Sequence, residues 1–176
     1  LLKEIIEGVR AECRDDFMLG VRLSSERFGI MLSESKQLAE DLMTSGDLDF
    51  LDMSLWDCFK EPEEEEFKGK TLIQHFCELE RGTTRLGVAG NLRTPQDVTR
   101  ALGEGVDWIM LGRAAILHHD FPKLYEEDDQ FVPSQIPVSV DYLTQEGLSP
   151  KFIEYMSNWG FVDGSVDRMK EAIKKA

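Results

Sequence analysis

The stretch that decides the fold is RLGVAGNLRTPQDVTRALGEGVDWIMLGRAAIL, residues 85–117. Its apolar runs at 85–89 and 108–111 are short and adjoin glycines, so each run predicts a buried strand. Between them, Thr94 is a plausible N-cap and Pro95 suits the first position of an amphipathic helix. A strand, a helix and a second strand in this order predict a parallel pair with a right-handed crossover.

The same alternation precedes this stretch. Strands are also predicted at Phe17–Ser24 and Phe50–Ser54. Helices are expected at 1–10, at 33–44 with Ser33 as N-cap, at 71–80 and at 94–105. The strands are nearly all apolar, as expected when both faces of a parallel sheet are covered. The sequence therefore predicts an α/β fold with four parallel strands.

The pattern changes after Asp120. Residues 131–137 contain two prolines and predict an extended linker. Short helices are expected to begin at Ser149, with Ile153 and Met156 inward, and at Ser165, with Met169 and Ile173 inward. Because few apolar residues remain for an independent core, we divide the chain into a barrel part, 1–125, and a helical extension packed on it, 126–176.

Composition narrows the range of partners. A formal net charge of −14 disfavours nucleic acid and anionic membranes, and no apolar run is long enough to cross a bilayer. The three cysteines form no CxxC pair, so neither a metal site nor a disulfide framework is predicted, and a cytoplasmic location is expected. The acidic block Glu61–Glu66 is interpreted as a solvated loop.

Two glycine-containing pairs follow consecutive strands. Gly90-Asn91 comes after one strand and Gly112-Arg113 after the next. Glycine exposes backbone N–H groups, a helix starting after Gly112 would add more, and arginine forms a fork suited to phosphate. In (β/α)8 barrels the last two strand-end loops commonly bind phosphate. The pattern favours a phosphate site, and the alternative is that these are turn glycines beside a surface arginine.

Arg22 ends an otherwise apolar strand, where burial without a partner is costly. Two interpretations stay open: a cation facing a ligand, or an ion pair with an acid on a neighbouring strand such as Asp52. The three histidines, His75, His118 and His119, are interpreted as structural or solvent-facing. No HExxH, Walker, GxGxxG or GxSxG motif occurs.

Three segments together resemble the old yellow enzyme family of NAD(P)H:flavin oxidoreductases. They are FMLGVRLS (17–24), LGVAGNLRTPQDVTRAL (86–102) and GVDWIMLGRAAILHHDFPKL (105–124). The tail segment at 142–162 is similar to the C-terminal extension of bacterial members. The resemblance implies strands five to eight of a partial (β/α)8 TIM barrel, followed by a helical extension.

The resemblance also implies a cofactor and roles for individual residues. FMN would be reduced by NAD(P)H and would pass hydride to a small-molecule acceptor such as an activated alkene. Arg22 would contact the pyrimidine edge of the flavin and support charge on its reduced form. The loop Ala89-Gly90-Asn91 would bind the FMN phosphate through its backbone, and Gly112-Arg113 would complete that site.

The family's catalytic residues come from its first four strands, so we expect them in an N-terminal half and expect this chain to be inactive alone. A half barrel would expose unpaired strand edges, which predicts that the chain joins an N-terminal half or self-associates. Two alternatives remain: a non-catalytic fragment that depends on a partner, and a phosphate-binding TIM-barrel enzyme without flavin.

Overall fold

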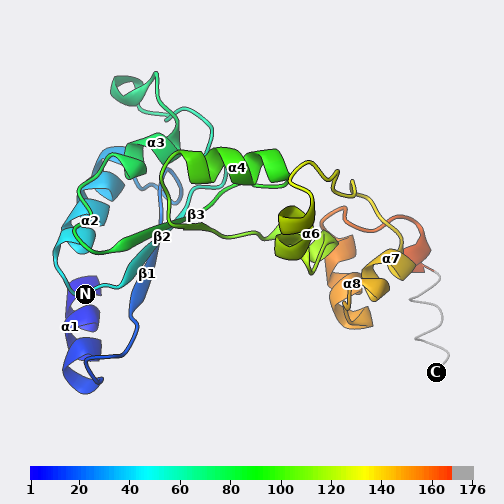
Figure 1. Cartoon of the computed structure of the whole chain (residues 1–176), viewed down its shortest axis with the longest axis horizontal. Coiled ribbons are helices and arrows are strands. Elements are labelled where there is room, and N and C mark those ends of the chain that lie inside the picture. Colours follow the sequence, from blue (N-terminus) through cyan, green and yellow to red (C-terminus); the bar gives the residue numbers. More distant parts are fainter. Residues whose placement is uncertain (168–176) are drawn as a thin grey trace. The chain divides into compact units, whose positions relative to one another are not determined.

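The computed structural model describes residues 1–167, and its first part alternates parallel strands with helices (Figure 1). The strands are β1 (Gly20–Ser24), β2 (Phe50–Ser54), β3 (Arg85–Ala89) and β4 (Trp108–Ile109). They form one parallel sheet in the order β1-β2-β3-β4. The predicted α/β architecture is confirmed. β2 and β3 have the predicted bounds, while β1 and β4 are shorter than predicted.

Helices lie at the predicted places after each strand, and those at Phe121–Glu127 and Val140–Gln145 are additional to those placed from the sequence. They are α1 (Leu2–Glu12), α2 (Leu32–Thr44), α3 (Leu72–Cys77), α4 (Pro95–Gly103), α5 (Arg113–Leu117), α6 (Phe121–Glu127), α7 (Val140–Gln145) and α8 (Pro150–Ser157), with a 3-10 turn at Glu65–Phe67. The prediction that Ser33 caps α2 is wrong, because the N-cap is Met31. Ser33 lies in the first turn, and its N–H and Oγ donate to the Glu64 carboxylate at 3.0 and 2.9 Å. Part of the acidic loop thus binds the start of α2.

The chain forms two compact units. The first comprises residues 1–92 and 97–110, and the second comprises 93–96 together with 111 onward. Residues 111–125, assigned from the sequence to the barrel, therefore group with the tail. Each unit is described separately below.

In the first unit the two faces of the sheet differ in character. Leu51, Met53 and Val88 are fully buried on one face, and α2 packs against β1 and β2. The opposite face carries Phe50 and Trp108, whose rings meet edge to face with centroids 5.4 Å apart and planes at 80°. This second face therefore combines aromatic rings with the polar residues described below.

Two glycines make this aromatic pair possible. A Cβ added to Gly20 would lie 2.1 Å from the ring of Phe50, and one added to Gly87 would lie 2.2 Å from the ring of Trp108. Each ring therefore lies directly over the neighbouring strand, in space that any larger residue would occupy.

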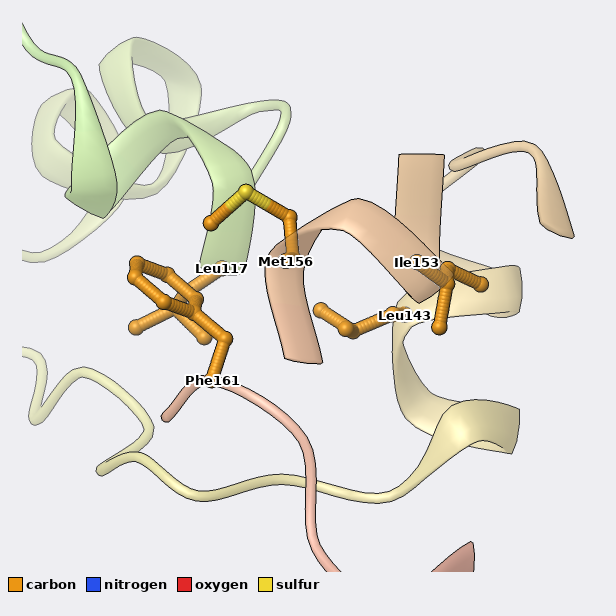
Figure 2. Close-up of a cluster of buried hydrophobic side chains, with 5 residues drawn as sticks. All are labelled: Leu117, Leu143, Ile153, Met156 and Phe161. Carbon is orange, nitrogen blue, oxygen red and sulfur yellow. The ribbon is translucent and has the colours of Figure 1, made fainter. Parts of the chain in front are cut away.

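The second unit has its own buried apolar cluster, shown in Figure 2. It consists of Leu117 from α5, Leu143 from α7, Ile153 and Met156 from α8, and Phe161. The predicted inward orientation of Ile153 and Met156 is confirmed, and Ser149 caps α8 by accepting from the Phe152 N–H at 3.3 Å. The predicted inward positions Met169 and Ile173 lie outside the described residues. Within the described part of the chain, no helix combines the length and the apolar character needed to span a bilayer.

Candidate functional site

Arg22 lies in β1 opposite Asp52 of β2. Its Nε is 3.2 Å from the Asp52 carboxylate, and its Nη2 donates to Ser54 Oγ at 3.1 Å. The Arg22 side chain is 52% exposed, whereas that of Asp52 is 5% exposed. The two interpretations of Arg22 are therefore compatible, since an ion pair holds the side chain while half of its surface stays open to solvent or a ligand.

Asp52 is buried in an unusual environment for a carboxylate. Burial raises its pKa above the ordinary value, and the charge of Arg22 only partly opposes this effect. One carboxylate oxygen, Oδ1, is buried without a hydrogen-bond partner among the described residues. Because buried polar atoms are normally paired, this oxygen marks a position where a further donor would be stabilising.

The loop after β3 is hydrogen-bonded to the loop after β2 and packs closely against it. The carbonyl of Ala89 accepts from the Leu55 N–H at 2.7 Å, and that of Gly90 accepts from the Cys58 N–H at 3.2 Å. A Cβ on Gly90 would lie 2.7 Å from the Cys58 backbone nitrogen. Close packing of two loops therefore requires glycine at this position, independently of any ligand.

Non-glycine residues with left-handed backbone follow three successive strands. Glu26 and Phe28 follow β1, Trp56 follows β2 and Asn91 follows β3, with φ between 56° and 59°. Asn91 tolerates this region best, and its Nδ2 donates to an oxygen of Asp57 at 3.2 Å. Left-handed conformations of larger residues are costly and concentrate at functional loops, so this end of the sheet is the better candidate for a site.

In the second unit, α5 begins at Arg113 with Gly112 as N-cap, as expected from the sequence. Arg113 and Arg93 line one pocket of about 110 Å³. Thr94, Ser134 and Gln135 contribute polar groups to its wall, and Leu117, Ile136 and Phe161 contribute apolar ones. Partial burial, followed by the positive charge of Arg93, lowers the pKa of Arg113.

Two guanidinium groups at one small pocket repel each other, and an anion between them would offset that repulsion. The arrangement is notable in a chain with a net charge of −14. Arg93 and Thr94 were not predicted as site residues from the sequence, where Thr94 was expected only as a helix N-cap. The available signal was an arginine two residues after the Gly90-Asn91 pair.

The sequence-predicted residues fall in both units. Arg22, Ala89, Gly90 and Asn91 belong to the first unit, whereas Gly112 and Arg113 belong to the second. The structure brings Arg22 together with Asp52 and Ser54, and Arg113 together with Arg93.

The three histidines have the structural or solvent-facing positions predicted for them. His75 is buried, and its Nε2 lies 2.9 Å from the carbonyl oxygen of Phe67. His118 Nε2 accepts from the Ser134 N–H at 2.9 Å. His119 is exposed, and its Nδ1 lies 2.8 Å from the carboxylate of Glu146.

The fold and these residues define an α/β protein with a four-stranded parallel sheet, compatible with part of an α/β barrel. Comparison of the chain with protein-family models, with curated proteins and with solved structures gives no match. The resemblance to the old yellow enzyme family therefore depends on the quoted segments alone.

Proposed function

We propose that this chain is the C-terminal half of an FMN-dependent NAD(P)H oxidoreductase of the old yellow enzyme type. Bound FMN would supply hydride transfer, from NAD(P)H to an activated alkene or a similar acceptor. Residues of this chain would bind and tune the cofactor, and the substrate-binding and proton-donating groups would come from an N-terminal half.

One observation carries the proposal: Arg93 and Arg113 line the same pocket, where partial burial and then the positive charge of Arg93 lower the pKa of Arg113. A phosphate monoester carries nearly two negative charges at neutral pH, so it offsets both guanidinium charges and accepts from both forks. Thr94 and Ser134 add polar groups of the kind that hydrogen-bond phosphate oxygens. These properties fit the phosphate group of FMN.

Arg22 supports the flavin part of the proposal. A cation beside the pyrimidine edge stabilises the negative charge that reduction places there. Pairing with buried Asp52 limits the motion of Arg22, and the exposed half of its side chain leaves donors for a ligand. In this proposal Asp52 is a positioning residue, because it acts through Arg22.

The test compares FMN with riboflavin, which lacks the phosphate. Titration of the full chain with each compound, followed by flavin fluorescence, gives two affinities for the wild type and for Arg113→Ala and Arg93→Ala. If both arginines bind phosphate, each substitution should weaken the affinity for FMN at least tenfold, or about 1.4 kcal/mol. The affinity for riboflavin should stay the same. Arg14→Ala is the matched control, since Arg14 is exposed and pairs with its near neighbour Asp16.

An equal loss of FMN and riboflavin affinity would indicate a folding defect and remove the phosphate assignment. Inorganic phosphate that binds through both arginines, without any affinity for FMN, would instead favour a phosphate-binding enzyme without flavin. Arg22→Met should make the reduction potential of bound FMN more negative. It should leave the ratio of the FMN and riboflavin affinities unchanged. An unchanged potential would contradict the role of Arg22.

A further inference from the structure

A second group of candidate ligands lies in the second unit, and none of its members lines the arginine pocket. His119 and Asp120 precede α6, and Glu146 directly follows α7. One ligand atom from each of the three side chains lies within 4.8 Å of the other two. No metal site is predicted from the sequence, because it contains no CxxC pair and no HExxH motif.

Glu146 is held in a fixed position beside His119. Its Oε2 accepts from the His119 backbone N–H at 2.9 Å and lies 2.8 Å from the ring Nδ1. Its side chain is only 16% exposed, whereas that of His119 is 63% exposed. The carboxylate is therefore preorganised, and the imidazole is accessible from solvent.

Asp120 adds a second carboxylate to the group. Its backbone carbonyl accepts from the Lys123 and Leu124 N–H groups, which fixes the residue at the start of α6. Within residues 1–167, its carboxylate has no hydrogen bond or ion pair and lies close to the like charge of Glu146. Both carboxylates also raise the pKa of His119, and a bound metal ion would replace the charge compensation that the protonated imidazole supplies.

We propose that His119, Asp120 and Glu146 bind one divalent transition-metal ion of the Zn²⁺ type. An imidazole with two carboxylates matches the preferences of Zn²⁺, and the nitrogen ligand disfavours Mg²⁺ and Ca²⁺. Tetrahedral bonds of about 2.0–2.2 Å place neighbouring ligand atoms roughly 3.3–3.6 Å apart. The ligand atoms of His119 and Glu146, 2.8 Å apart, would move slightly apart on binding the ion, and that of Asp120, within 4.8 Å of both, would move closer.

The ion would replace the proton that His119 Nδ1 shares with Glu146, and that proton would leave to solvent. Water would complete the coordination, because the site is open. The bound ion would join the segment that precedes α6 to the end of α7. This inference is independent of the flavin proposal.

The test is calorimetric titration of the full chain with ZnCl₂ in excess Mg²⁺, which occupies weak acidic sites. Thiols are the competing zinc ligands. Burial raises the pKa of Cys58 to about 12 and that of Cys77 to about 11, so both remain protonated. A Cys13→Ser background removes the third thiol.

In that background we expect one site, which tightens as the pH rises from 6 to 8. His119→Ala and Glu146→Gln should each weaken it at least tenfold. The matched control is Glu127→Gln, which removes an exposed carboxylate of α6 that pairs with Lys123. Zinc should also shift the ring NMR signals of His119 and leave those of buried His75 in place.

Equal affinities in the parent and His119→Ala would overturn the proposal, as would a site weaker than about 1 mM. The NMR measurement uses unsubstituted His119, so it does not depend on whether a variant folds. Perturbation of His75 to the same extent as His119 would also contradict the assignment.

Discussion

Arg22 and Asp52 occupy the same register on neighbouring parallel strands, and their side chains form an ion pair of 3.2 Å in which only the carboxylate is buried. Burial and pairing act in opposite directions on Asp52. Burial is the larger effect, because the net result is a raised pKa. The ionised form of Asp52 is therefore less favourable in the folded protein than in the unfolded chain.

Asp52→Asn tests this balance. The folded state takes up a proton at Asp52 more readily than the unfolded chain, so wild-type stability gains from protonation as the pH falls through the folded pKa towards 3.8. Asparagine cannot contribute this gain. The stability of the variant minus that of the wild type should therefore be larger at pH 7 than at pH 4, as measured by urea unfolding. A difference that does not vary with pH would contradict the raised pKa.

The contact between Gly87 and Trp108 predicts a non-additive pair. Gly87→Ala places a Cβ 2.2 Å from the indole ring, so it should destabilise the protein by about 1–3 kcal/mol. In a Trp108→Ala background that clash is absent and the cost should fall. A double-mutant cycle should give a coupling of about 0.5–3 kcal/mol. Additive effects would show that the ring moves aside freely.

Gly90 and Gly103 should respond in opposite ways to alanine. Gly90→Ala would clash with the Cys58 backbone at 2.7 Å and should cost about 1–3 kcal/mol. Gly103 ends α4 and has no atom within 4 Å of its Cβ position, so alanine there should stabilise by about 0.5–1 kcal/mol. Urea unfolding of both variants checks the contrast. Equal effects would indicate that the loop after β3 adapts.

Glu146 should control the titration of His119. The hydrogen bond to Glu146 is the main cause of the raised His119 pKa, and the charges of Asp120 and Glu146 act in the same direction. Glu146→Gln should therefore lower this pKa towards 6.5, as followed by ring NMR signals without metal. The stabilisation from the pair is present below 6.5 and is lost as the pH rises through the raised pKa. Glu127→Gln should leave the titration unchanged.

The strands were predictable because short apolar runs between glycines and polar loops determine both their length and their position. β2 and β3 match their predicted bounds for this reason. The start of α2 was misassigned, since Ser33 meets the carboxylate of Glu64, a residue 31 positions away. Rules based on local sequence identify the serine as a possible cap, but they do not include an acceptor so far away in the sequence.

The candidate site was only partly predictable. Pairing of Arg22 with Asp52 was one of two interpretations of Arg22 from the sequence, and the structure places both residues in register at the middle of their strands, rather than at a strand end. Arg93 was missed, because only the folded chain places it in one pocket with Arg113. Gly90 was selected for its backbone freedom, whereas packing against Cys58 gives it a second role that sequence does not reveal.

The exposure and backbone conformation of Phe28 have a consequence for protein engineering. Its ring is 86% exposed and its backbone is left-handed, so neither hydration nor conformation favours phenylalanine at this position. A screen for variants with higher thermal stability should select substitutions of Phe28, with glycine or asparagine among the selected residues. The exchange would remove little buried apolar area, because only a small part of the ring is covered by the rest of the protein.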